Sequence, residues 1–300
     1  MINSRHAYLV FAHKNPNQLA LLLRLLDHPQ NDIYLHLDPA ARVFDREKLR
    51  AAVRQSTLFL CSVHHFAWGG EALIDGIRTL LTEATKKDHL YYHLLSGLDL
   101  PLKPQAEIHA FFAANAGLEY IDFDEPVISG ALLQNRMQTY HFFQNSRERY
   151  PLIKSLDCFL LTIQYKIGLN RLKNSGVLFQ KGSLWFSITH DFALYCLKNA
   201  PVYRPYFRFS KCGDELFFHT MLVNSPFLGR KATKTYNDNR ATMRLIDWDR
   251  GNGTSPYVFR AVDYDEITQS GMLFARKFDE TVDANIIERI KQYVSGDTIF

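Results

Sequence analysis

The sequence predicts an α/β fold, a Rossmann-like and mostly parallel sheet covered by helices on both faces. Strand-like and helix-like segments alternate through residues 1–125. The strand-like segments are continuous apolar runs such as 8–12, which are typical of strands buried on both faces. Alternation with short connections favours right-handed β-α-β units and hence a parallel sheet. With 300 residues, 47% of them hydrophobic, the chain can bury the core of one large domain.

The elements of the first half follow from these runs and from helical spacing. Asn15 and Pro16 predict a helix start, with asparagine at the cap and proline at the first helical position. Strands are predicted at 8–12, 33–38, 58–63, 90–95 and 118–123, and further helices around 73–84 and 108–112. Ligands bind outside the carboxyl ends of parallel strands. The side chains just past these ends should therefore line one edge of the sheet, namely His13, Asp38, Trp68 and Asp99.

The regular alternation fades between residues 126 and 180. This segment is rich in Tyr, Phe, Arg and Lys and predicts a helical insertion, which serves either as an ordinary cover or in acceptor binding. Beyond it, strands are predicted at 184–188 and 257–261 and helices at 190–199, 214–223 and 286–294. We interpret the chain as a single domain, 1–300, in which the insertion separates residues 1–125 from residues 181–300.

Charge and cysteine content limit the classes of function. The net charge is +4 with acids and bases interspersed, which disfavours nucleic-acid binding and fits an anionic ligand or an anionic membrane surface equally well. The four cysteines form no CxxC pair, so reduced thiols are expected and a zinc site is not. No secretory signal pattern and no run of some eighteen apolar residues is seen. We therefore expect a cytoplasmic protein that can attach peripherally to the inner face of a membrane.

Common nucleotide-binding and nucleophile motifs are missing from the sequence. No GxGxxG follows the first strand, which disfavours a dinucleotide dehydrogenase, and neither GxxxxGK[ST] nor GxSxG occurs. Three Asp-x-Asp triplets stand at 122–124, 247–249 and 263–265. Paired carboxylates can hold Mg²⁺ or Mn²⁺ against a diphosphate. Such triplets also arise by chance at this acid content, and the three cannot all be one metal site.

Two short segments carry the strongest candidates for chemistry. Asp214 and Glu215 begin a predicted helix, where carboxylates favour the positive end of the dipole. Asp214 fits that capping role, whereas Glu215 precedes apolar residues and fits either a cap or a partly buried general base. The segment 274–279 places Arg276 and Lys277 between aromatic side chains, as a solvated basic pair or as fixed cations for a diphosphate.

Taken together, these segments resemble the core-2/I-branching β-1,6-N-acetylglucosaminyltransferase and peptide O-xylosyltransferase family. The resemblance extends over nearly the whole chain in the family's order, at 7–15, 34–38 (the "HxD" strand end), 67–70, 95–103, 181–186, 214–215 and 274–279. It implies a GT-A fold, an inverting transfer from a UDP-sugar to a glycan hydroxyl, and no required metal or other cofactor. Residues 1–125 would then form the nucleotide-binding half and 181–300 the acceptor and catalytic half.

The resemblance also implies roles for individual residues. Glu215 would be the general base, Lys277 would hold the diphosphate and Asp38 would contact the uracil. His13 and Asp99 would line the donor side of the same edge. Contacts to the acceptor or its sugar rings are implied or expected for Glu119, Arg136, Trp185 and Trp248, and Tyr140 offers a further flat ring.

The sequence departs from the family pattern at one basic residue. The branching enzymes carry an arginine upstream of the lysine, whereas 253–256 has none, so Arg260 or Arg276 would take its place. The animal enzymes also have a membrane anchor and many cysteines, so the sequence favours a bacterial-type cytoplasmic member with a bacterial surface glycan as acceptor.

Several alternatives stay open at this level. UDP-GlcNAc is the expected donor, with UDP-xylose or UDP-glucuronate as alternatives within the family. A catalytically silent carbohydrate- or nucleotide-binding protein would keep the fold without the reaction. An NAD- or phosphate-handling Rossmann-like enzyme is the third hypothesis, and the missing glycine fingerprint argues against it.

Overall fold

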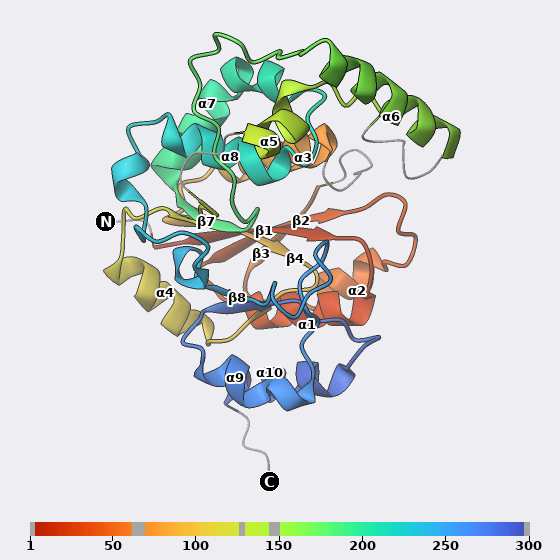
Figure 1. Cartoon of the computed structure of the whole chain (residues 1–300). Helices are drawn as coiled ribbons and strands as arrows, with labels where there is room; N and C mark the ends of the chain where they lie inside the picture. The colour runs from red at the N-terminus through yellow and green to blue at the C-terminus, as the bar shows by residue number, and fades with distance from the viewer. Residues whose placement is uncertain (1–3, 62–69, 126–129, 144–150, 297–300) are drawn as a thin grey trace.

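The computed structural model describes residues 4–61, 70–125, 130–143 and 151–296, which build two sheets between layers of helices (Figure 1). The larger sheet has the order β3-β2-β1-β4-β7-β6, with β1 His6–Ala12, β2 Asn31–Leu37, β3 Thr57–Cys61, β4 Tyr91–Ser96, β6 Tyr120–Ile121 and β7 Phe186–Thr189. Strands β1 to β4 are parallel, and β7 runs antiparallel to both β4 and β6. The predicted α/β class with a mostly parallel sheet is confirmed.

Helices cover both faces of this sheet, because alternate side chains of the apolar strands enter two separate cores. Leu9 and Phe11 pack into one core, and Tyr8 and Val10 pack into the other. The first core is closed by α3 (Glu71–Ala84), α7 (His190–Phe207) and α8 (Asp214–Val223). The second is closed by α1 (Pro16–Leu26), α2 (Arg46–Ala51), α4 (Gln105–Ala114), α9 (Tyr264–Gln269) and α10 (Ala284–Ser295). Figure 1 shows the two groups of helices above and below the sheet.

The smaller sheet attaches the C-terminal part of the chain to the loop that follows β4. Its order is β5-β9-β8, with β5 Leu100–Pro101, β9 Phe274–Arg276 and β8 Arg244–Ile246. The backbone N–H of Phe278 donates to the carbonyl of Leu98 at 2.9 Å. The buried guanidinium of Arg244 donates to the carbonyls of Leu94, at 3.2 Å, and Phe186, at 2.6 Å. Residues 274–279 are thereby held at the carboxyl end of the parallel strands.

The region between β6 and β7 is helical where it is described. It contains α5 (Gly130–Leu133), the π-helix η1 (Gln134–Gln138) and α6 (Pro151–Lys166). Three short 3-10 helices, η2 (Leu228–Arg230), η3 (Asn239–Ala241) and η4 (Ala261–Asp263), lie in the later loops. No helix in the described part of the chain is long and apolar enough to cross a bilayer. The cysteines Cys61, Cys158, Cys196 and Cys212 are free thiols.

Three local predictions are corrected by the structure. Asn15 adopts a left-handed conformation (φ 57°) without a side-chain cap bond to α1, although Pro16 does begin that helix. The predicted strand at 257–261 is not a strand; most of it is an extended segment in which the N–H of Phe259 donates to the carbonyl of Lys277 at 2.9 Å. Helix α7 continues to Phe207, well past the predicted end at residue 199.

Candidate active site

The site is built at the carboxyl edge of the sheet, where β1 has β2 on one side and β4 on the other. This change of direction opens a crevice beyond the strand ends, the usual ligand position in such sheets. The loops after β1 and β4 meet there, because the N–H of Gly97 donates to Phe11 at 2.8 Å. A Cβ at Gly97 would lie 3.2 Å from the Cβ of Ala12, so glycine permits this close approach. Trp68, also predicted for this edge, lies outside the described residues.

A cluster of cations lies at this edge. Lys277 donates to Ser255 Oγ at 3.0 Å, and Lys14 Nζ lies 2.5 Å from a carboxylate oxygen of Asp279. Burial first, and then the nearby charges of Lys14 and Arg276, lower the pKa of Lys277. The neighbouring cations disfavour the charged form of Lys277 because they create a positive potential around it. A region of positive potential suits an anionic ligand.

The structure brings three predicted donor residues into this cluster. The pKa of His13 is lowered by burial and then by Lys14 and Lys277, and it is raised in part by Asp38. Asp38 and Lys277 therefore both lie within electrostatic reach of His13. Asp38 also accepts a hydrogen bond from the N–H of Ala40 at 2.9 Å, which shapes the loop after β2.

Lys14 and Asp279 complete the cluster and were missed as site residues by the sequence reasoning. Although burial opposes it, the hydrogen bonds from Lys14, Thr281 and Asn15 hold the pKa of Asp279 below its usual range. Asn15 donates to Asp279 at 2.8 Å, which explains why it does not cap α1. The available signal was position, since Lys14 directly follows His13 and Asp279 ends the segment that carries Lys277.

Two other predicted donor residues, Asp99 and Arg276, point into the protein. Asp99 is buried and accepts bonds from the N–H of Ser96, at 2.8 Å, and its hydroxyl, at 2.9 Å. Arg276 lies 3.4 Å from Asp99, and its guanidinium carbon stands 3.8 Å from the ring centre of Trp185. The Trp185 side chain is 5% exposed. Asp99 and Arg276 therefore stabilise the loop and cover the indole, and this geometry does not support the predicted sugar contact of Trp185.

Arg260 and Trp248 have different placements. Arg260 is exposed at the start of η4, its N–H donates to Asp263 at 2.7 Å, and its charge acts on Asp283. Trp248 is 43% exposed in the loop after β8. That loop lies beside the segment that pairs with Lys277, since the N–H of Tyr257 donates to Asp247 at 2.8 Å. Trp248 stays a predicted sugar contact, whereas Arg260 does not join the cations.

Glu215 is in the first turn of α8, and it lies at the same edge of the sheet because its carbonyl accepts from the N–H of Gly182, just before the antiparallel strand β7. Arg136, in η1, donates from Nη1 to its carboxylate at 2.6 Å. Lys181 Nζ is 3.9 Å from the same oxygen and also contacts Asp124. The carboxylate is held between two cations and is only partly exposed, which fits a positioned base.

Close backbone contacts fix the start of α8. The N–H of Gly182 donates to the carbonyl of Glu215 at 3.0 Å. A Cβ at Gly182 would lie 2.0 Å from the carbonyl oxygen of Asp122, so this approach requires glycine. Gly213, not Asp214, precedes the first helical residue. Asp214 is buried, and burial followed by repulsion from Glu215 raises its pKa to about 7, whereas hydrogen bonds from backbone N–H groups of the first turn lower it, as the predicted role at the helix start requires.

Glu119 is placed away from this edge, against the sequence prediction of an acceptor contact. Its buried carboxylate accepts from the N–H of Thr189, at 2.9 Å, and from its hydroxyl, at 2.5 Å. Thr189 pairs with Tyr91, the first residue of β4, whereas the site lies beyond the last. Since β4 has six residues, Glu119 is about 15–20 Å along the strands from the site.

Each of the three Asp-x-Asp triplets has at least one carboxylate that contacts a basic side chain of the protein. Asp124 contacts Lys181, and Asp247 and Asp263 both contact Arg250. Asp122 accepts from the N–H of Asp238 at 3.2 Å, and burial raises its pKa to about 6. Residues 4–61, 70–125, 130–143 and 151–296 contain no group of three or more His, Cys, Asp or Glu side chains that could hold a metal ion.

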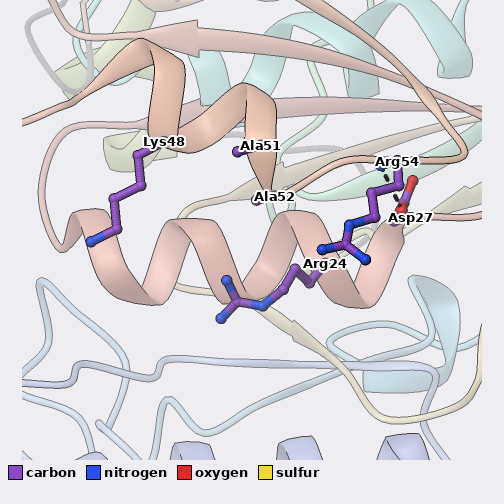
Figure 2. A pocket seen from close by; sticks show the side chains of 6 residues that line it. All are labelled: Arg24, Asp27, Lys48, Ala51, Ala52 and Arg54. Carbon is purple, nitrogen blue, oxygen red and sulfur yellow. Dashed lines mark hydrogen bonds between the residues drawn. The ribbon is translucent and has the colours of Figure 1, made fainter.

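An open cavity of about 530 Å³ lies between α1 and α2 and is separate from this edge (Figure 2). It is lined by Arg24, Asp27, Lys48, Ala51, Ala52 and Arg54. Asp27 accepts from the N–H groups of residues 54 to 56, so it forms the turn between α2 and β3. None of the predicted site residues lines this cavity.

Comparison with known proteins shows the family of the chain. The family model described as "Branch: Core-2/I-Branching enzyme" matches residues 6–270. Curated relatives include Xylosyltransferase 2 of Canis lupus familiaris, 24% identical over 97% of this chain and 34% of the relative, and that of Bos taurus, 25% identical over 98% and 34%. The chain thus spans about a third of the length of these relatives. They are mammalian, so the expectation of a bacterial-type member is not supported.

A solved structure is also similar, though weakly. The crystal structure of mouse Xyloside xylosyltransferase 1 in its apo form matches with a TM-score of 0.40 and 13% identity, over 90% of this chain and 96% of that one. A similarity this low supports no conclusion about the site. The family match covers most of the chain and agrees with the fold described above. The chain belongs to the Core-2/I-Branching enzyme family.

Proposed function

We propose that the chain transfers a sugar from a UDP-sugar to a hydroxyl of a glycan with inversion at the anomeric carbon. The observation that supports this proposal is that Glu215 and Lys277 are both held by backbone contacts to loops at the carboxyl edge of the sheet, each beside a further cation, Arg136 and Lys14 respectively. One group is suited to accept a proton and the other to bind a diphosphate. The edge is also where α/β sheets of this topology bind nucleotides.

Glu215 is the proposed general base. The acceptor oxygen attacks the anomeric carbon on the face opposite UDP, its proton passes to the carboxylate, and the bond from that carbon to the diphosphate oxygen breaks. Sugar hydroxyls are weak acids, so a positioned base contributes roughly 10²–10⁴-fold. Arg136 fixes the orientation of the carboxylate through their 2.6 Å hydrogen bond.

Lys277 and Lys14 are the proposed partners of the departing diphosphate. Negative charge develops on the leaving group, and preorganised cations stabilise it without reorganisation. Lys14 takes the place that the sequence left to Arg260 or Arg276, because Arg276 is buried against Trp185 and Arg260 lies with Asp263 and Asp283. The proposal includes no divalent metal and no other cofactor.

The proposed donor is UDP-GlcNAc, with UDP-xylose as the alternative. UDP-GlcNAc rests on the branching family that the motifs resemble. UDP-xylose is favoured by the names of the relatives, which are xylosyltransferases. The acceptor is proposed as an oligosaccharide or other glycan. A cytoplasmic location and a bacterial surface glycan stay predictions.

The proposal is tested by supplying the full chain with UDP-GlcNAc, UDP-xylose and UDP-glucuronate in separate reactions, with a panel of oligosaccharide acceptors, and measuring released UDP and glycosylated product. Turnover with one donor, with inversion seen by NMR of the product, supports it. Binding of UDP without turnover of any of the three donors would instead favour a catalytically silent binding protein.

A further inference from the structure

Helix α6 exposes several large apolar side chains and buries two polar ones. Its two fully covered residues are Asp157 and Gln164, seven positions apart on one face. Gln164 bonds the backbone of Tyr140 in both directions, accepting from its N–H at 2.7 Å and donating to its carbonyl at 3.1 Å. A helix that only covers a core presents the opposite arrangement. The outward face of α6 is therefore arranged for contact with something other than water.

The exposed apolar residues of α6 form one continuous stripe. Their exposed fractions are 86% for Leu152, 46% for Leu156, 61% for Phe159 and 41% for Ile163. These positions follow the spacing i, i+4, i+7 and i+11, which aligns side chains along one side of a helix. Ile167, just past the helix, is 68% exposed and extends the stripe by one turn.

The charges around this stripe have one sign. Lys154 and Lys166 are exposed on the helix, and Lys173 is exposed shortly after it. The sole acid between residues 151 and 175 is Asp157, which is on the covered face. An exposed apolar stripe on a helix whose exposed charges are all lysines is the pattern of a helix that lies in the interface of an anionic bilayer.

A second copy of this chain is a poorer partner for the stripe. A two-fold contact would set the stripe against the same stripe and the lysines against the same lysines, without an exposed carboxylate on either helix to compensate. Anionic phospholipid headgroups offer the complementary charge, and acyl chains accept the apolar side chains.

Helix α6 and the segment after it contact the two sequence neighbours of the residue that orients the proposed base. Tyr165 donates to Asn135 at 3.4 Å, and Arg171 donates to the carbonyl of Met137 at 2.7 Å. Between those two residues of η1 lies Arg136, the partner of Glu215. In Figure 1, α6 lies at the outer side of the molecule, away from the sheet. A bilayer against α6 would bring membrane-attached glycans next to the acceptor side of the site.

We infer that the stripe of α6, Leu152, Leu156, Phe159 and Ile163, binds the surface of anionic membranes. The placement of the acceptor in this inference rests on the proposed function, whereas the membrane contact does not. The contact is shallow, as only one side of a sixteen-residue helix is available.

The test is co-sedimentation of the full chain with vesicles, without donor or acceptor, so that its outcome is independent of catalysis. Vesicles of equal parts phosphatidylglycerol and phosphatidylcholine should bind the wild type, with weaker binding to phosphatidylcholine alone and at high salt. The double variant Leu156→Gln/Phe159→Gln should reduce the partition coefficient roughly tenfold or more. Lys154→Gln and Lys166→Gln should each reduce it roughly fivefold.

Matched control substitutions are available on other surfaces. Val202 is 66% exposed on α7 and Val262 is 86% exposed in η4, so Val202→Gln/Val262→Gln should bind vesicles like the wild type. Circular dichroism and melting temperature establish that each variant is folded. Failure of the wild type to sediment with phosphatidylglycerol vesicles, or equal sedimentation of the α6 variant, would overturn the inference. So would a wild-type dimer in light scattering that the α6 variant converts to a monomer.

Discussion

Arg136 and Glu215, 79 residues apart in the sequence, are joined by a hydrogen bond of 2.6 Å between the guanidinium and the carboxylate. The first belongs to a π-helix and the second to the opening turn of α8. A backbone hydrogen bond also joins η1 to the loop before α8, since the N–H of Lys211 donates to the carbonyl of Arg136 at 2.9 Å. The proposed base is thus oriented by a residue from the segment that the sequence marked only as a helical insertion.

Replacing Arg136 by Gln should slow transfer while leaving the binding of UDP unchanged. The loss of a charge-assisted hydrogen bond to the base is expected to lower kcat roughly tenfold to a hundredfold. Steady-state kinetics and UDP titration measure the two effects separately. The exposed Arg240, in η3, provides the control Arg240→Gln, which should leave kcat unchanged. If the Arg136 variant lost UDP binding and kept kcat, the Arg136–Glu215 pair would act in donor binding and not in proton transfer.

Lys277→Met and Lys14→Met should weaken UDP binding. Each removes one charged partner of the diphosphate, so the Kd for UDP is expected to rise roughly tenfold to a hundredfold. Isothermal titration calorimetry measures the change, with Lys48→Met on α2 as a control lysine outside the site. An unchanged Kd in the Lys14 variant would show that Lys14 does not bind the diphosphate. Arg260 and Arg276 would then again be the candidates for the second cation.

Transfer should continue in the presence of EDTA. In the proposed mechanism the charge of the departing diphosphate is stabilised by lysines, so chelation removes nothing that the reaction uses. Initial rates with and without EDTA, and after adding back Mg²⁺ or Mn²⁺, give the comparison. Complete loss of turnover that Mn²⁺ restores would show a metal-dependent enzyme. The Asp-x-Asp triplets would then be the candidates for the metal site.

Glu119→Gln should change the pH dependence of stability. Burial raises the pKa of Glu119 to about 7 from an ordinary value of 4.5. A group whose pKa is higher in the folded state contributes its full stabilisation of the fold at pH values below its unfolded-state pKa. That contribution is lost as the pH rises through its folded-state pKa. The wild type should therefore lose about 3 kcal/mol relative to the variant between pH 4.5 and 7. Urea unfolding of both proteins across this range measures the difference, and parallel stability curves would contradict the assignment.

The sequence was informative where structure depends on local pattern. Runs such as 8–12 and 33–38 predicted strands because burial on both faces leaves a continuous apolar signature. The edge that carries His13 and Asp38 followed from the same logic, since the carboxyl ends of parallel strands coincide. The placement of Lys277 near both then depended on a resemblance, not on spacing.

What the sequence could not supply was the pairing of distant side chains. Whether Arg276 faces solvent or Trp185 is decided by strand β9 packing on the loop after β4, which no local pattern reports. The acceptor contact of Glu119 came from the resemblance alone, and it does not fit the structure because Glu119 precedes β6, which runs in the direction of β4, and so lies at the opposite end of the strands. Lys14 was overlooked because a lone lysine in a loop is ordinarily a solvated surface residue.

The central claim is that Glu215 takes the proton of the acceptor hydroxyl, and the isosteric variant Glu215→Gln tests it most directly. The account predicts that transfer falls by roughly 10²–10⁴-fold while the Kd for UDP stays as in the wild type. Glu288→Gln, on the exposed side of α10, should behave as the wild type in both measurements. Near-normal turnover by Glu215→Gln would contradict the account and require another base.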